Sequence, residues 1–113
     1  MQGKNDAALQ GRIEKRLSKL TDPGTGLDVL RMGLIRDLTV SDGVASLVFG
    51  PSSRHCPIAF RIGSDVYDAV RSVPGIYRVV VRAANFERAA ELEELLRTKE
   101  RDRVAQEAHH ADV

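Results

Sequence analysis

The stretch that decides the fold is LIRDLTVSDGVASLVFG, residues 34–50. Two runs with the composition of β-strands flank Ser-Asp-Gly at positions 41–43, and Asp-Gly between such runs is a strong signal for a tight hairpin turn. The first run alternates between apolar and polar residues, although Arg36 interrupts its apolar face. We therefore predict an antiparallel pair of strands at the centre of the chain.

A helix and a third strand are predicted after the hairpin. Pro57 suits the first turn of a helix, because its missing N–H would have no intrahelical partner there. Apolar residues then recur every three or four positions, at Ile58, Ile62, Val66, Val70 and Val73. Gly63 interrupts this stripe, which predicts a bent helix or a late start at Ser64. Val-Pro-Gly at 73–75 ends the helix, and IYRVVVRA at 76–83 has the β-branched composition of a strand.

Two further helices are predicted at the ends of the chain. The N-terminal helix has an apolar stripe and stops at TDPGTG, residues 21–26, where proline and glycine favour turns. The stripe consists of Leu9, Ile13, Leu17 and Leu20. A C-terminal helix is predicted over about 86–108, with glutamates first and basic residues later, which complements the helix dipole. A short disordered tail containing His109 and His110 is expected after it, with adventitious metal binding as the alternative.

These elements predict a small single α+β domain that occupies residues 1–113. Its core, about residues 7–84, has the order α-β-β-α-β, with a three-stranded mixed sheet covered by helices on one face and the C-terminal helix added after it. The order of the strands in the sheet stays open. A chain of 113 residues can bury a core without disulfides or structural metals.

The composition disfavours several classes of partner. The chain has 17 basic and 16 acidic side chains and only two Tyr and three Phe, so nucleic-acid binding is not expected. No secretory signal and no membrane-spanning run is recognisable, and the single cysteine is typical of a reducing compartment. We therefore expect a cytoplasmic protein that does not bind membranes.

The loop SSRHCPIAF, residues 52–60, contains the only cysteine, Cys56. A thiol at the start of a helix faces free backbone N–H groups, which favour the thiolate, as Arg54 or a protonated His55 would if they turned toward the sulfur. A thiolate can ligate iron or zinc, or attack a persulfide or a disulfide. The alternative is that Cys56 acts only as a small buried hydrophobic residue.

No enzymatic activity is predicted. A cysteine nucleophile needs a positioned general base and an oxyanion hole, and the sequence identifies neither. The glycines of DPGTG follow a helix rather than a strand, so they do not form a phosphate-binding loop. Asp22, in the same stretch, either hydrogen-bonds backbone amides in its turn or lies beside Cys56.

Five short motifs occur in a characteristic order. They are Asp-Pro after the first helix, Gly-Leu-Ile at the first strand, Asp-Gly in the hairpin, Cys-Pro before the second helix, and Val-Pro-Gly-Ile before the last strand. With these motifs, residues 13–83 resemble the iron–sulfur (metal–sulfur) cluster assembly accessory domain family. That family includes SUF-associated accessory proteins and the phenylacetate-oxygenase assembly protein.

The resemblance implies a function as well as the α-β-β-α-β core. It implies an accessory role in assembling iron–sulfur clusters or delivering them to client apoproteins, with Cys56 as the functional residue and Asp22 as the aspartate of the Asp-Pro motif. Because a cluster usually needs four cysteines, Cys56 would be a shared ligand for a transient cluster or iron, with none bound permanently. The other ligands would come from a client apoprotein, a cluster scaffold protein, a small thiol, or a homodimer with facing Cys56 residues.

Two departures from the family pattern keep a second function open. Gly24 replaces the glutamate that usually follows Asp-Pro, and Ser52 and Ser53 are the nearest hydroxyls where a threonine is usual before Cys-Pro. The alternative is therefore a thiol-independent protein-interaction module of the same fold, such as an operon-specific maturation subunit.

Overall fold

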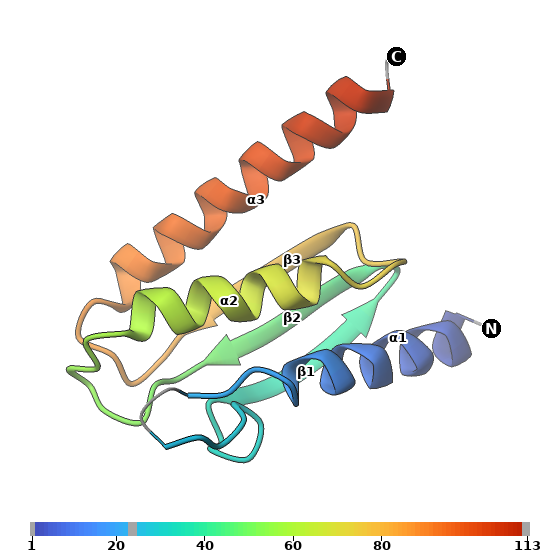
Figure 1. Ribbon diagram of the computed structural model, residues 1–113. Helices are drawn as coiled ribbons and strands as arrows, with labels where there is room; N and C mark the ends of the chain where they lie inside the picture. The colour runs from blue at the N-terminus through green and yellow to red at the C-terminus, as the bar shows by residue number, and fades with distance from the viewer. Residues whose placement is uncertain (1, 23–24, 112–113) are drawn as a thin grey trace.

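The computed structural model describes residues 2–22 and 25–111 and confirms the predicted α+β order (Figure 1). The elements are α1 (Gln2–Leu17), β1 (Ile35–Ser41), β2 (Val44–Phe49), α2 (Ala59–Arg71), β3 (Arg78–Ala83) and α3 (Ala89–Ala111). Within the described residues, none of the helices combines the length and apolar character needed to cross a bilayer.

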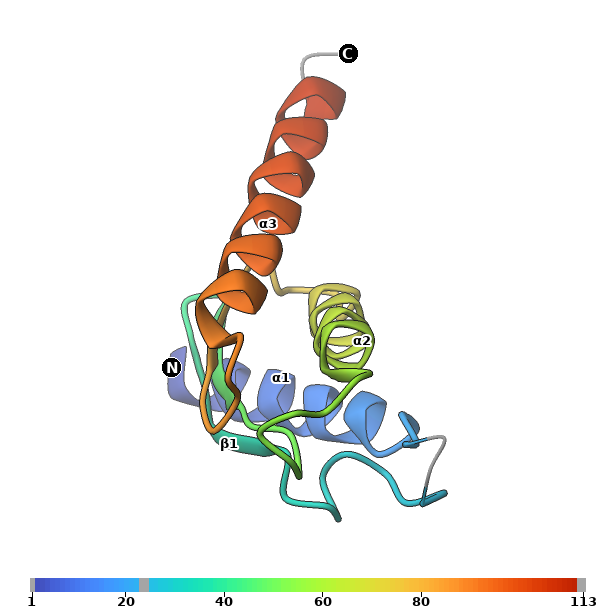
Figure 2. The ribbon, with the colours of Figure 1, turned by 90° about the vertical axis from the view of Figure 1, so that its left-hand side faces the viewer.

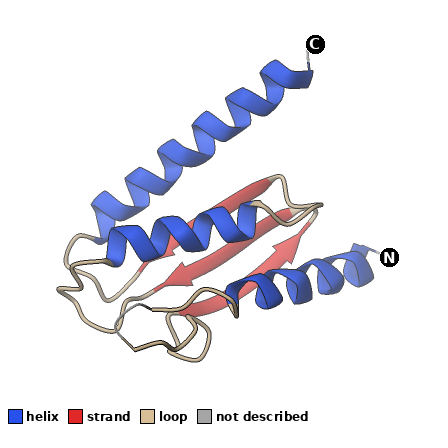
Figure 3. Cartoon of the chain, viewed as in Figure 1, coloured by secondary structure: helices blue, strands red, loops and turns tan. Residues whose placement is uncertain are grey.

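The three strands form one mixed sheet in the order β1-β2-β3 (Figure 3). Strands β1 and β2 are antiparallel, and β2 and β3 are parallel with α2 as the connection between them. Asp42 and Gly43 both have positive φ, 52° and 80°, which is the backbone that a two-residue hairpin turn requires. The predicted hairpin and mixed sheet are therefore confirmed.

A β-bulge explains why the alternation in the first strand is imperfect. Arg36 pairs with Val48, but the next paired residues are Thr39 and Ser46, so β1 contains one residue more than β2 over this interval. Asp37 lies in the bulge with a φ of 52°. The extra residue moves the side chains that follow it to the opposite face of the sheet. A single two-residue alternation therefore does not fit the whole of β1.

The hydrophobic core lies between one face of the sheet and two helices. Figure 2 shows α1 and α2 on the same side of the sheet, and both helices contact each other and the strands. Alternate residues of β2 and β3 point into this layer and are buried, whereas the other face of the sheet is not covered by any described helix. The buried residues include Leu9, Ile13, Leu17, Leu47, Phe49, Val66, Val70, Val79 and Val81.

Helix α2 runs from Ala59 to Arg71 without a break at Gly63, so the predicted late start at Ser64 is wrong. A Cβ at Gly63 would lie 3.2 Å from Leu92 Cδ1 and 3.5 Å from the ring of Phe49. The glycine therefore allows α3 and the sheet to pack closely against α2. The helix begins at Ala59, two residues after Pro57, which precedes the helix rather than occupying its first turn.

Helix α3 differs from its predicted boundaries at both ends. It begins at Ala89 rather than at residue 86, and it continues to Ala111, so residues 109–111 are helical where a disordered tail was predicted. The side chains of His109 and His110 lie outside the described part of the structure. Figure 1 shows α3 extending away from the sheet toward its C-terminal end.

Polar contacts with α2 hold the middle of α3 in place. The Arg71 side chain is 2% exposed, and it donates to Glu100 at 3.2 Å, to the carbonyl of Ile76 at 3.1 Å, and to Glu107. The hydroxyl of Tyr67 also donates to Glu100. Burial and the neighbouring Glu100 carboxylate both raise the pKa of Tyr67, because both disfavour its phenolate.

Candidate functional site

The loop containing Cys56 lies at one end of the sheet, with the segment before β1 and the connection between β3 and α3 (Figure 1). Gly50 N–H donates to the carbonyl of Leu34 at 2.8 Å, which joins the start of this loop to the segment before β1. A cavity of about 180 Å³ there is lined by residues of all three segments, including Met32, Ser52 and Asn85. The fold therefore brings together three loops that are far apart in the sequence.

Cys56 is a free, half-buried cysteine that packs against the edge of the core. Its N–H donates to the carbonyl of Ser53 at 3.2 Å, and its carbonyl accepts the N–H of Ala59 at 3.3 Å. The N-cap of α2 is Ile58, so Cys56 lies two residues before the cap rather than in the helix. The residue as a whole is partly exposed, and it lies in a turn that precedes the helix.

The side chain of His55 is directed toward Glu87. Its Nδ1 lies 2.6 Å from Glu87 Oε2, and the two side chains are 75% and 46% exposed. The backbone N–H of Glu87 donates to the carbonyl of Arg54 at 3.0 Å, while Arg54 itself is exposed. Glu87 was not predicted from the sequence, because it lies 32 positions after His55 and no local pattern links the two.

An aromatic contact adds a second link between the Cys56 loop and the start of α3. The rings of Phe60 and Phe86 meet edge to face, with centroids 5.8 Å apart. The guanidinium of Arg88 lies 4.5 Å from the centre of the Phe60 ring, a favourable cation–π arrangement. Together with the Glu87 contacts, this packing fixes the position of the loop.

Asp22 shapes the turn after α1. It is nearly buried, its N–H donates to the carbonyl of Leu27 at 2.9 Å, and its carbonyl accepts the N–H of Gly26 at 2.8 Å. The hydroxyl of Thr25 lies 3.5 Å from its carboxylate. These bonds belong to the main chain of Asp22 and to the Thr25 hydroxyl, so the role predicted for the Asp22 carboxylate stays a prediction, and Pro23 and Gly24 lie outside the described residues.

The Asp22 turn and the start of α2 share a cavity of about 150 Å³. Thr21, next to Asp22, lines one side, and Ile58 and Arg61 of the α2 segment line the other. Among the side chains that the structure describes, those of residues 6–22 and 25–107, no group of three or more His, Cys, Asp or Glu is arranged to hold a metal ion. The predicted residues Cys56, His55 and Asp22 thus do not form such a group, and the described part of the chain offers one sulfur ligand rather than a complete set.

The fold and this loop define a class: small α+β domains with a single partly exposed thiol at one end of a three-stranded sheet. The sequence model of the family described as "Iron-sulfur cluster assembly protein" matches residues 10–82. This chain belongs to that family, as the resemblance predicted.

Two curated proteins and one solved structure are similar to this chain. The chain is 29% identical over 85 residues to the uncharacterized protein MJ1129 of Methanocaldococcus jannaschii, covering 74% of this chain and 90% of that protein. It is 29% identical over 72 residues to the Fe-S protein maturation auxiliary factor YitW of Bacillus subtilis, covering 63% and 71% of the two chains. The crystal structure of a domain of unknown function, DUF59, from Bacillus anthracis superposes with a TM-score of 0.66 at 26% identity, covering 73% and 79%.

Proposed function

We propose that this chain is an accessory factor in iron–sulfur cluster assembly, which helps to assemble clusters or deliver them to client apoproteins with Cys56 as a shared ligand for iron or sulfur. Membership of the iron–sulfur cluster assembly family supports the general role, and the likeness to a maturation auxiliary factor supports a link to client proteins. The observation that carries the specific role is the position of Cys56, a half-buried free thiol in a loop fixed by its neighbours.

The number of ligands determines how Cys56 would act. Iron–sulfur clusters usually need four cysteines, and the chain has one cysteine. A cluster or iron ion is therefore cargo that Cys56 holds together with ligands from a scaffold protein, a client apoprotein, a small thiol or a second copy of the chain. Such sharing favours transfer, because the cargo leaves when the other ligands change.

The test compares the wild type with Cys56→Ala under anaerobic conditions. Each protein is incubated with ferrous iron and sulfide, and bound iron and the maturation of an iron–sulfur apoprotein are measured. The variant is expected to lose both. Thr98→Ala, a change at an exposed residue of α3, serves as the control and should behave as the wild type. Equal iron binding and equal maturation by Cys56→Ala would refute the proposed role.

A thiol-independent interaction module is the second candidate, and one observation favours it. The Nδ1 of His55 is paired with Glu87, so it is not offered as a second ligand beside Cys56. Alkylation of Cys56 by iodoacetamide across a range of pH separates the candidates, because a thiolate reacts and a thiol does not. Rapid reaction near neutral pH supports the ligand role, whereas slow reaction together with full maturation by Cys56→Ala supports the module.

A further inference from the structure

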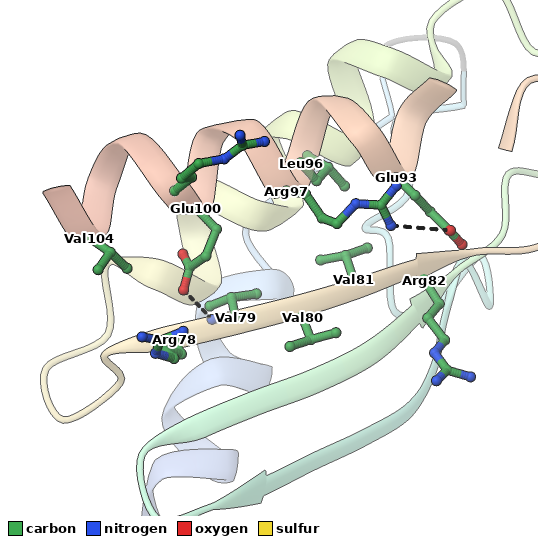
Figure 4. Close-up of a pocket in the computed structure, with 11 residues that line it drawn as sticks. Arg78, Val79, Val80, Val81, Arg82, Glu93, Leu96, Arg97, Glu100 and Val104 are labelled. Carbon is green, nitrogen blue, oxygen red and sulfur yellow. Dashed lines mark hydrogen bonds and ion pairs between the residues drawn. The ribbon is translucent and has the colours of Figure 1, made fainter. Parts of the chain in front are cut away.

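A groove of about 860 Å³ lies between β3 and α3, away from the residues of the candidate site (Figure 4). Residues 78–82 of β3 form one side, and the facing residues of α3 form the other. The α3 residues are Glu93, Leu96, Arg97, Glu100, Arg101 and Val104. Helix α3 lies beyond residues 10–82, so the matched family region does not by itself form this groove.

The outer edge of β3 is already occupied at two positions. Val79 N–H donates to Glu100 Oε1 at 2.9 Å, and Ala83 N–H donates to Glu93 Oε2 at 2.8 Å (Figure 4 shows the first contact). These carboxylates from α3 take the places that an added strand would need. A ligand in this region therefore has to be recognised by side chains rather than by β-strand addition.

The side chains along β3 alternate between basic and apolar on the uncovered face of the sheet. Arg78, Val80 and Arg82 point to this face and are exposed, and Val80 is 49% exposed. Among the described residues, neither Arg78 nor Arg82 forms an ion pair with a carboxylate. Arg97 and Arg101 on α3 add positive charge, although Arg97 pairs with acidic residues of its own helix and both lie near Glu94.

The neighbouring strands continue this pattern across the sheet. Strand pairing places Val48 beside Arg82 and Arg36 beyond it, while Val44 lies beside Arg78. Among the described residues, Arg36 forms no ion pair with a carboxylate either. The two ends of the β3 row are thus basic, and the positions between and beside them are apolar or small and polar.

The spacing of the arginines selects an extended ligand. Residues four apart on a strand are separated by about 13 Å, whereas residues four apart on a helix are separated by only about 6 Å along its axis. Acidic residues at the first and fifth positions of an extended segment match Arg78 and Arg82, and an apolar residue at the third position meets Val80. The groove has no aromatic side chain on which a nucleic-acid base could stack.

We propose that the groove and the adjoining β3 row bind an extended segment of a partner protein with acidic residues at its first and fifth positions and an apolar residue at its third. The segment lies over Val80, with its carboxylates at Arg78 and Arg82. This surface would select a protein partner, and it goes beyond the proposed cluster role because it does not involve Cys56.

The test measures binding of a fluorescent peptide containing Asp-Ser-Val-Ser-Asp by anisotropy, with amide chemical shifts of β3 as a second readout. A composition-matched peptide, Asp-Asp-Val-Ser-Ser, should bind about tenfold more weakly, because its charges cannot reach both arginines. Arg78→Glu and Arg82→Glu should each weaken binding of the first peptide by about tenfold. Arg12→Glu, the same charge change at an exposed residue of α1, should leave binding unchanged. Circular dichroism checks that each variant is folded.

Three results would overturn the proposal: no binding at millimolar peptide, equal binding of the two peptides, or unchanged binding by both β3 variants. Equally tight, β3-dependent binding of a single-stranded oligonucleotide would also overturn it, because the surface would then recognise phosphates. Cys56→Ala is expected to bind the peptide like the wild type. The peptide assay contains no iron, so its failure and a failure of the cluster role are distinguishable.

Discussion

Replacing Glu100 by alanine tests whether α3 is held to the domain by its polar contacts. The carboxylate of Glu100 accepts hydrogen bonds from three groups: the hydroxyl of Tyr67, the side chain of Arg71 and the backbone N–H of Val79. Two apolar residues of α3, Leu92 and Leu96, are also buried, but both precede this point in the helix. Glu100→Ala therefore removes the acceptor at the middle of the helix.

The expected loss of stability follows from the burial of these groups. The side chains of Arg71 and Glu100 are 2% and 15% exposed, and breaking a buried ion pair costs about 3–5 kcal/mol because one charge stays unpaired. Arg71 keeps Glu107 and the carbonyl of Ile76 as partners, which lowers the cost. Each lost hydrogen bond from Tyr67 and Val79 adds about 1 kcal/mol. Because Arg71 keeps its other partners, we take about 1 kcal/mol for the ion pair and about 2 kcal/mol for the two hydrogen bonds, a total of about 3 kcal/mol.

Urea unfolding followed by circular dichroism measures this loss, and hydrogen exchange of the Val79 amide reports whether α3 has detached locally. Glu100→Gln, which keeps an acceptor, should lose less stability than Glu100→Ala. Glu94→Ala is the control, because Glu94 is exposed on the same helix and pairs only with exposed arginines. A change below about 1 kcal/mol in Glu100→Ala, with unchanged exchange at Val79, would show that these contacts do not hold the helix.

Three further changes have defined outcomes. The raised pKa of Tyr67 means that its contribution is present below about pH 10 and falls as the pH rises, so Tyr67→Phe should make the urea midpoint less dependent on pH above 9 than in the wild type. Gly63→Leu should lower the unfolding free energy by about 2 kcal/mol, measured by urea unfolding, because even a Cβ there lies 3.2 Å from Leu92. Gly43→Ala should cost about 1–2 kcal/mol in the same assay, since its φ is 80°.

The hairpin could be predicted because its signal is local. Asp42 and Gly43 favour positive φ, and two strand-like runs flank them, so neighbouring residues alone determine the turn. The bulge in β1 could not be predicted directly. Its only sign in the sequence is Arg36, which interrupts the apolar alternation of the strand. The late helix start predicted from Gly63 is wrong, because this glycine lets Leu92 pack closely against α2. Leu92 belongs to a different helix, so no local pattern indicates this contact.

The candidate site could be predicted only in part. Pro57 and the apolar stripe after it predict a helix that begins directly after Cys56, whereas α2 begins at Ala59, so Cys56 lies two residues before the N-cap Ile58. The partner of His55 could not be predicted, because Glu87 reaches it only after the chain has passed through α2 and β3. Glu93 lies among the glutamates near the start of the predicted C-terminal helix, and no local pattern indicates that its carboxylate accepts the N–H of Ala83.

The protection of both sheet edges has a consequence for how the chain behaves at high concentration. An uncovered strand edge is a template on which copies of a protein can stack into fibrils. Carboxylates of α3 occupy amides along β3, and the bulge at Asp37 distorts β1. Removing α3, residues 89–111, would therefore uncover β3 as an edge strand, and the truncated protein should aggregate at a lower concentration than the full chain, as measured by light scattering.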